Sequence, residues 1–374
     1  MEATAPGLGV TRPVRSRTVY FAGPVADPFL VGGISIALYL VCRALPGFAD
    51  SEHFFAASSF LVWVVNWPHF AATNYRLYRS RSTRLQFPMT AHVLPFVMFG
   101  FLLLAWMSPS VFAPMLMKLY LLWSPYHFSG QTVGLAMLYA RRSNYSLSIL
   151  QRRSLIGFVF LTYMYTSARA EIGIANRHFY EVRYPSLGVP EWFPAFLGRG
   201  MWLLAAAFVA ETVRQAVLKR RLVPYLVVLP AVAQCVWFVG PVAGNFKTLV
   251  PMFHSLQYLF IAWLVSLYEG KPRDVAGAGH RPWRSFRYRT AQYAAYSFLG
   301  GVFLFWIAPR IGELFGRSIG FSSAVILSVV QIHHFFVDGV VWCLKSAGAV
   351  LPLDGSLKDY LRRQPTPILA PVAT

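Results

Sequence analysis

The 374-residue chain has little charge for its length. Only 13% of its residues are charged, whereas 56% are hydrophobic. A soluble domain usually carries about 25% charged residues. Apolar runs of roughly 18 residues or more recur along the chain, and each is long enough to cross a hydrocarbon core of about 30 Å. The composition excludes a soluble globular protein and predicts an all-α, polytopic transmembrane helix bundle.

Cysteine is also scarce. The chain has three cysteines, each inside an apolar stretch and none in a CxxC pair: Cys42, Cys235 and Cys343. This pattern excludes a disulfide framework and a thiolate metal site. No HExxH motif is present, so the sequence also lacks the signature of a zinc metalloprotease.

Acidic residues are few, which leaves a formal net charge of +20. A nucleic-acid-binding surface would need a folded polar face, and no polar stretch is long enough to form one. Most lysines and arginines instead fall in every second short loop between apolar runs, as expected of cytoplasmic loops. We therefore expect membrane lipids and no nucleic acid as partners, while no feature indicates an oligomeric state.

The apolar runs predict ten spans with both termini cytoplasmic. The predicted spans are 28–47, 54–75, 88–108, 112–140, 154–169, 196–217, 222–240, 244–268, 290–310 and 319–344. Residues 1–27 and 345–374 form the expected cytoplasmic ends of the 28–344 bundle. The longest outer loop, 170–195, is a candidate lid, and the basic loop 270–289 is expected to meet anionic headgroups. The arginine- and alanine-rich composition favours a multi-pass protein of a bacterial inner membrane.

Histidines are unusually frequent inside the predicted spans. Nine occur in the chain, and six of them fall in apolar stretches: His69, His92, His127, His254, His333 and His334. Ionisable groups in hydrocarbon usually face a protein interior or a functional cavity. Because neutral imidazole is the commonest metal ligand, these residues are candidates for a metal site.

Position narrows the candidates to spans that run in the same direction. His69, His127 and His254 lie on the second, fourth and eighth spans, and the pair His333–His334 lies on the tenth. All are even-numbered spans, so these helices run in the same direction, and histidines at similar depth on them can converge in the bundle core. The depth of His254 depends on the start of its span: it is deep enough if the helix begins near Gly244 and too shallow if it begins near Leu249. Adjacent residues point about 100° apart on a helix. We expect His334 to face the site, because Gln331 and Asp338 share its face, although His333 remains a candidate ligand.

Polar neighbours accompany the candidate ligands at helical spacing. Gln131 follows His127 by four residues, Gln257 and Tyr258 follow His254 by three and four, and Asp338 follows His334 by four. Such side chains can hold the second nitrogen of a ligating imidazole. We expect Gln131, Gln257 and Asp338 to orient ligands, and Tyr258 to contact oxygen or substrate as a catalytic group.

An imidazole-rich site suits iron, zinc or copper better than magnesium or calcium. Zinc would favour hydrolysis with a carboxylate base, and haem held by two histidines is a further option. Four-histidine iron with open positions suits oxygen activation on a lipophilic substrate that arrives through the bilayer. A transporter that uses the histidines as a proton relay, a subunit of a membrane complex and histidines that serve packing alone are the alternatives.

Three local sequences resemble motifs of the Brp/Blh-type β-carotene 15,15′-dioxygenase family of membrane iron enzymes. They are Pro68-His69-Phe70-Ala71-Ala72-Thr73, His127-Phe128-Ser129-Gly130 and His254-Ser255-Leu256-Gln257-Tyr258. The resemblance implies that His69, His127 and His254 bind Fe(II) and that the substrate is a carotenoid or another lipid. Phe70 and Thr73 replace the family's Gly and Asp, and Tyr258 stands where its fourth histidine is expected. His333 or His334 is then the candidate for the missing ligand.

Overall fold

The computed structural model describes residues 19–79, 81–172, 177–269, 282–342, 353 and 355–362. Helices make up most of this part of the chain. The strands β1 (His178–Phe179) and β2 (Val182–Arg183) pair antiparallel in a short hairpin. The described residues therefore confirm the all-α class, whereas most of the predicted segments 1–27 and 345–374 and part of the loop 270–289 lie outside them.

Several helices of the first half contain π-helical turns. The label η is used both for these π turns and for the 3-10 turns. The elements are α1 (Ala26–Pro28), η1 (Phe29–Gly33), α2 (Ile34–Ala44), η2 (Phe48–Asp50), α3 (Glu52–Leu61), η3 (Val62–Asn66), α4 (Trp67–Arg79), α5 (Arg81–Gln86), η4 (Met89–Val93), α6 (Leu94–Met107), α7 (Phe112–Arg142) and α8 (Ile149–Glu171). The π turns η1, η3 and η4 each continue directly into a longer α-helix.

The second half follows the hairpin and is also helical. Its elements are α9 (Trp192–Lys219), α10 (Tyr225–Phe238), η5 (Phe246–Leu249), α11 (Val250–Glu269), α12 (Pro282–Val302), η6 (Phe303–Ile307), α13 (Ala308–Glu313), α14 (Ile319–Val341) and α16 (Leu357–Arg362). Each of the ten predicted spans overlaps one helical segment, and most of the boundaries agree to within about five residues, whereas the helix around 290–310 begins earlier, at Pro282. A long apolar run in this chain is also a run of good helix formers.

Six helical stretches of the described chain are long and apolar enough to cross a membrane. They are Ala26–Ala44, Met89–Met107, Trp192–Lys219, Gly244–Tyr268, Phe286–Glu313 and Ile319–Val341. The helix Tyr225–Phe238 is apolar but shorter. The segments around α4, α7 and α8 carry more polar residues, and two of these helices supply the site described below. The count of ten spans stays a prediction.

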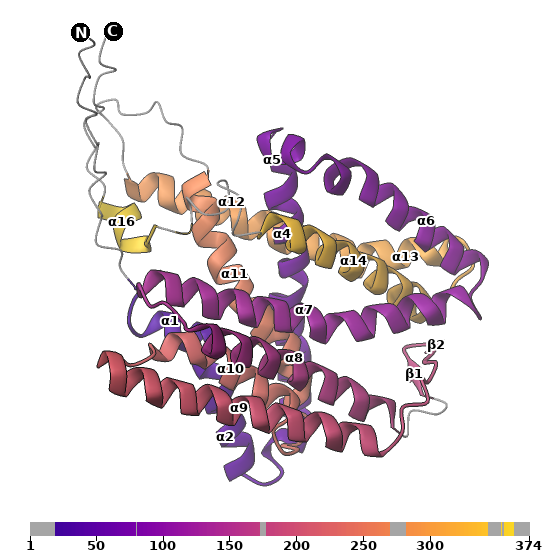
Figure 1. Ribbon diagram of the computed structural model, residues 1–374. Helices are drawn as coiled ribbons and strands as arrows, with labels where there is room; N and C mark the ends of the chain where they lie inside the picture. Colours follow the sequence, from indigo (N-terminus) through magenta and orange to yellow (C-terminus); the bar gives the residue numbers. More distant parts are fainter. Residues whose placement is uncertain are drawn as a thin grey trace, which may run out of the picture.

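The bundle has central and peripheral helices. In the most apolar window of Gly244–Tyr268, 72% of residues are buried, and in that of Ile319–Val341, 61%, against 17% for Met89–Met107. Figure 1 shows α8 and α9 side by side, α7 and α14 beyond them, and α4 and α11 crossing behind. Peripheral helices expose large apolar side chains such as Phe96 at 76% and Leu203 at 71%. A soluble monomer rarely exposes so much apolar surface, whereas lipid would cover it.

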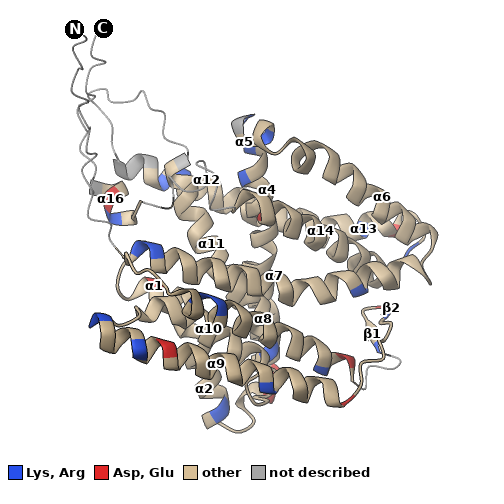
Figure 2. Ribbon diagram, viewed as in Figure 1, with Lys and Arg blue, Asp and Glu red and all other residues tan. Residues whose placement is uncertain are grey.

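Charged residues gather at helix ends rather than along the helices. In Figure 2, lysines and arginines cluster around α5 and at the C-terminal ends of α7 and α9, while the middle of the bundle is almost free of charge. This distribution follows the alternation of basic loops in the sequence. It leaves the interior of the bundle to a small set of buried polar residues.

Candidate metal centre

Four buried histidines from four helices meet in the middle of the bundle. His69 on α4, His127 on α7, His254 on α11 and His334 on α14 each offer a ligand atom, and these atoms all lie within 4.8 Å of one another. The ring centroids of His69 and His334 are 4.3 Å apart, and those of His127 and His254 are 5.1 Å apart. The structure thus brings together four of the five predicted ligands.

Prolines and a π turn shape the helices next to these histidines. The π turn η3 ends at Asn66, two residues before Pro68 of the Pro68–His69 pair, and Pro125 lies inside α7 two residues before His127. Proline removes one backbone hydrogen bond of a helix, and a π turn shifts the direction of the side chains that follow it. The Asn66 side chain also accepts a hydrogen bond from Ser255 at 2.7 Å, which joins α11 to η3 beside the site.

Aromatic side chains hold the imidazole rings in place. The His254 ring stacks on Phe128 with centroids 4.0 Å apart and an interplanar angle of 22°. The His127 ring stacks on Phe335 at 4.7 Å, and the edge of Tyr258 meets His69 at 4.2 Å. Ring packing therefore orients these imidazoles. In many metal sites a hydrogen bond to the imidazole nitrogen that does not bind the metal has this role.

Several of these ring nitrogens have no partner. Both nitrogens of His69, both of His254 and Nδ1 of His334 are buried without a hydrogen bond in the described part of the chain. Leaving a buried polar atom unpaired costs about 1–3 kcal/mol, and native interiors avoid it almost everywhere. One metal ion bound to the group would take a nitrogen lone pair from each ring. The donor set fits a transition metal that prefers imidazole.

Asp338 lies at the same place. Its Oδ2 is 3.4 Å from His334 Nε2 and 3.6 Å from His127 Nε2, and these two nitrogens are 3.2 Å apart. Two ligands that each lie about 2.1 Å from one ion are separated by roughly 3.0–3.4 Å at octahedral or tetrahedral angles. The spacing of the three atoms is close to that of ligands on one ion, so Asp338 can bind the metal as well as orient a ligand.

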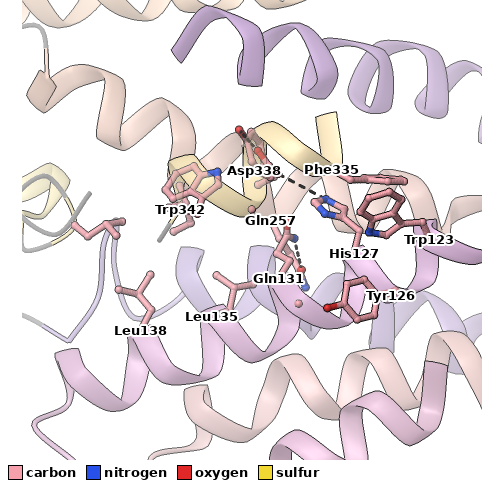
Figure 3. A pocket seen from close by; sticks show the side chains of 16 residues that line it. Trp123, Tyr126, His127, Gln131, Leu135, Leu138, Gln257, Phe335, Asp338 and Trp342 are labelled. Carbon is pink, nitrogen blue, oxygen red and sulfur yellow. Dashed lines mark hydrogen bonds and ion pairs between the residues drawn. The ribbon is translucent and has the colours of Figure 1, made fainter. Parts of the chain in front are cut away.

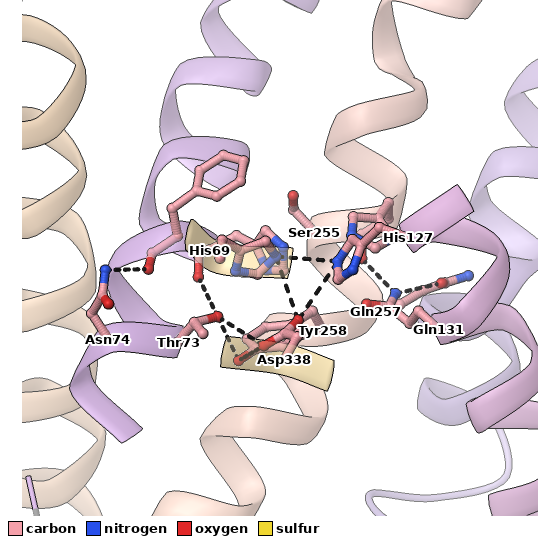
Figure 4. A network of polar contacts seen from close by, with 12 residues as sticks. His69, Thr73, Asn74, His127, Gln131, Ser255, Gln257, Tyr258 and Asp338 are labelled. Atoms are coloured by element: carbon pink, nitrogen blue, oxygen red, sulfur yellow. Dashed lines mark hydrogen bonds and ion pairs between the residues drawn. The ribbon is translucent and has the colours of Figure 1, made fainter. Parts of the chain in front are cut away.

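The other carboxylate oxygen of Asp338 joins a small hydroxyl network (Figure 4). Tyr258 donates to Oδ1 at 3.1 Å, and the Thr73 hydroxyl lies 2.6 Å from the Tyr258 oxygen and 3.2 Å from Oδ1. The predicted catalytic residue Tyr258 thus contacts the centre through Asp338. Sequence reasoning missed the roles of Thr73 and Asn66, although Thr73 follows His69 by four residues and so shares its helix face.

Three other predicted site residues are placed differently from the prediction. His333 is half-buried and is not part of the cluster, because the 100° step along α14 turns it away from the face of His334. The Gln131 amide donates to the backbone carbonyl of His254 at 2.9 Å and to Gln257 Oε1 at 3.0 Å, and Gln257 donates to the carbonyl of Val31. These glutamines tie backbones together instead of holding imidazole rings.

Two cavities meet at the cluster. A largely apolar cavity of about 350 Å³ extends from His127 and Asp338 toward Leu138 and Leu353 between α7, α11 and α14 (Figure 3). A smaller cavity of about 240 Å³ is lined by all four histidines. Both include His127 and Phe335. The four-histidine centre therefore borders two cavities, and the larger of the two is mainly apolar.

The hairpin between α8 and α9 contributes to the wall of the smaller cavity. Phe179 of β1 and the neighbouring Tyr180 line it together with the histidines. Glu171, at the end of α8, accepts hydrogen bonds from the Tyr184 hydroxyl and the Leu187 amide, both at 2.9 Å. Glu171 thus holds the Tyr184–Leu187 part of the segment 170–195 to the end of α8, and the lid role of this segment stays a prediction.

No family model matches the sequence, and no curated protein or solved structure is significantly similar to the chain.

Proposed function

We propose that this chain is a non-haem iron oxygenase of the cell's inner membrane that acts on a lipophilic substrate such as a carotenoid or another lipid. Ten spans with both termini cytoplasmic belong to the same proposal. The observation that carries it is the group of four buried imidazoles, three of which have ring nitrogens without a hydrogen-bond partner. A buried group of this kind is costly unless an ion completes it.

The donor set favours iron. His127, His334 and Asp338 present two nitrogens and one carboxylate oxygen around one point, as in the two-histidine, one-carboxylate sites of Fe(II) oxygenases. When bound, iron would supply the activation of dioxygen. Zinc would bind the same atoms. A haem between two of these histidines is disfavoured, because the rings lie in direct contact, with centroids as close as 4.3 Å.

The residues around the centre have distinct roles in this proposal. The Tyr258 hydroxyl donates to Asp338 Oδ1, which leaves Oδ2 directed at the two imidazole nitrogens. The apolar cavity would exclude water and receive the hydrocarbon part of the substrate, as ligand cavities of this kind do. Thr73, which hydrogen-bonds Tyr258 at 2.6 Å, would keep the tyrosine proton on the side of the carboxylate.

The departures from the Brp/Blh-type motifs also support the proposal. Thr73 and Tyr258 stand where that family has Asp and His, and the two residues hydrogen-bond each other. The helix α14 places a histidine and an aspartate beside them: the ring of His334 is 5.9 Å from that of Tyr258, and Asp338 Oδ1 accepts from Tyr258 and lies 3.2 Å from the Thr73 hydroxyl oxygen. The histidine and the aspartate that the motifs of this chain lack would thus be supplied by His334 and Asp338 of α14.

Metal analysis of the purified protein tests this function. We expect about one iron per chain in the wild type, a loss of most of it in His127→Ala and His334→Ala, and full retention in His92→Ala, a histidine on the exposed side of η4. Product formation from a carotenoid should require dioxygen and follow the iron content. A wild-type protein without metal after expression in iron-supplemented medium would end the proposal.

A transporter is the second candidate, because the two cavities meet at His127 and Phe335. Such an arrangement resembles a path interrupted by one layer of side chains, and intramembrane histidines can relay protons. Uptake of solutes into proteoliposomes, driven by a pH gradient and lost in His127→Ala, would favour this function over the oxygenase.

A further inference from the structure

One buried acceptor in a side chain that lines the apolar cavity has no partner among the described residues. The Gln131 amide nitrogen uses its two hydrogens for the carbonyl of His254 and for Gln257 Oε1. The Gln257 amide donates to the carbonyl of Val31, which fixes its orientation and therefore that of Gln131. The Gln131 Oε1 is left buried without a partner, and Gln131 lines the cavity. A buried oxygen of this kind takes a hydrogen-bond donor when one is offered.

Glycines form the walls next to this oxygen. Gly130 and Gly134 on α7 and Gly339 on α14 line the cavity, and a Cβ added at any of the three would meet no atom within 4 Å. Gly130 and Gly134 are four residues apart and share one face of α7. The space in front of them is therefore wide enough for a guest and is not filled by the chain itself.

The cavity has exposed residues at one end and buried apolar residues at the other. Gly130 and Gly339 are exposed on the surface of α7 and α14, next to Tyr126, which is 46% exposed. The opposite end is formed by the buried residues Leu138 and Leu353. An opening between two helices of a membrane bundle faces the acyl chains of the lipid, so an apolar guest can enter without crossing water.

We propose that this cavity binds a single hydrocarbon chain that carries a hydroxyl group, a long-chain or isoprenoid alcohol, with its hydroxyl donating to Gln131 Oε1. The inference rests on the proposed oxygenase function and names its substrate class. The chain enters between the glycines of α7 and α14. Because Gln131 lies one helical turn from His127, the carbon atoms next to the hydroxyl then lie at the metal centre.

Binding of two probes that differ only in the hydroxyl tests the acceptor. We would measure the occupancy of hexadecan-1-ol and of hexadecane on the full-length protein by native mass spectrometry from the same detergent. One neutral hydrogen bond predicts a roughly five-fold preference for the alcohol. Gln131→Leu should reduce this preference to about one while the alkane still binds. Equal binding of both probes to the wild type, as expected if only water meets Oε1, would overturn the proposal.

A glycine substitution tests the place of binding. Gly134→Leu fills the cavity without a clash at its Cβ and should lower the occupancy of both probes at least ten-fold. Gly100→Leu on α6 is the matched control, since its Cβ also meets open space but Gly100 does not line the cavity. Unchanged binding in Gly134→Leu would overturn the cavity assignment. Metal content, measured in parallel, reports separately on the oxygenase: a metal-free wild type that still prefers the alcohol removes the oxygenase and leaves the cavity proposal.

Discussion

Two of the clusters of buried polar side chains in the described chain differ in how completely they are paired. At the end of α8, Lys118 Nζ lies 2.5 Å from Glu171 Oε1 and 3.9 Å from the ring centre of Tyr184, and both carboxylate oxygens of Glu171 accept further hydrogen bonds. At the centre, the ring nitrogens of His69 and His254 have no partner in the described chain. The first cluster is complete as it stands, whereas the second needs something from outside the chain.

The difference separates a structural role from a binding role. Burial and the neighbouring Glu171 carboxylate raise the pKa of Tyr184, so its hydroxyl stays protonated and keeps donating at physiological pH. The first cluster thus holds the loop to α7 and α8 without any ligand. Buried ionisable groups alone would make both clusters candidate binding sites. The number of buried atoms without a hydrogen-bond partner distinguishes the two.

The largest expected effect comes from breaking the paired cluster. Glu171→Leu leaves the Lys118 charge buried without its partner and should lower the free energy of unfolding by about 3–5 kcal/mol. The double variant Lys118→Met/Glu171→Leu should recover most of this loss, because no lone charge remains. Thermal unfolding in detergent measures both, with metal content as the control. Equal destabilisation in the single and double variants would show that the ion pair is not the structural element.

The unpaired cluster should respond to metal instead. Added Fe(II) at about one hundred times its dissociation constant should stabilise the wild type by about 2.7 kcal/mol, and a chelator should reverse the effect. His334→Ala should remove this response, whereas Glu171→Leu should keep it despite its lower starting stability. The measurement is the midpoint of thermal unfolding against anaerobic Fe(II) concentration. A metal response that survives in His334→Ala contradicts the shared site.

A smaller effect on metal affinity is expected from substitutions in the network around Asp338. Asp338→Asn keeps the shape of the side chain and an acceptor for Tyr258 and Thr73, but it removes the charge that faces the two imidazole nitrogens. Metal affinity should fall by roughly 10–100-fold. Thr73→Val, which removes only one hydroxyl of the network, should change affinity less than five-fold. Titration with Fe(II) in a competition assay compares the two, and an equal loss in both would assign Asp338 a positioning role alone.

The sequence predicted the helices well because each depends on a local apolar run. It also indicated that His69, His127, His254 and His334 meet, since parallel spans with histidines at similar depth constrain where the side chains can be. Both arguments use only position along one helix and its direction across the bilayer. Neither needs to know which helices are neighbours.

What the sequence could not supply depends on neighbouring helices. The pairing of Asn66 with Ser255 and the contact of Thr73 with Asp338 join residues about 190 and 265 positions apart. Sequence reasoning expected Gln131 and Gln257 to orient imidazole rings, whereas in the structure their amides donate to the backbone carbonyls of His254 and Val31. One local signal was available: Pro68, Pro125 and Pro251 each precede a site histidine by one to three residues.

The smallest expected effect distinguishes two adjacent residues. His333 and His334 carry the same side chain, but α14 directs the two side chains to different sides. Of the two, only His334 belongs to the cluster of described residues. His333→Ala should change stability by no more than about 0.5 kcal/mol, as expected of a partly exposed side chain, and should leave the iron content at the wild-type level. Elemental analysis of the two single variants side by side measures this. If His333→Ala loses iron and His334→Ala keeps it, then α14 presents the face of His333 to the centre, and the contact of Asp338 with the centre would be lost, because Asp338 shares the face of His334.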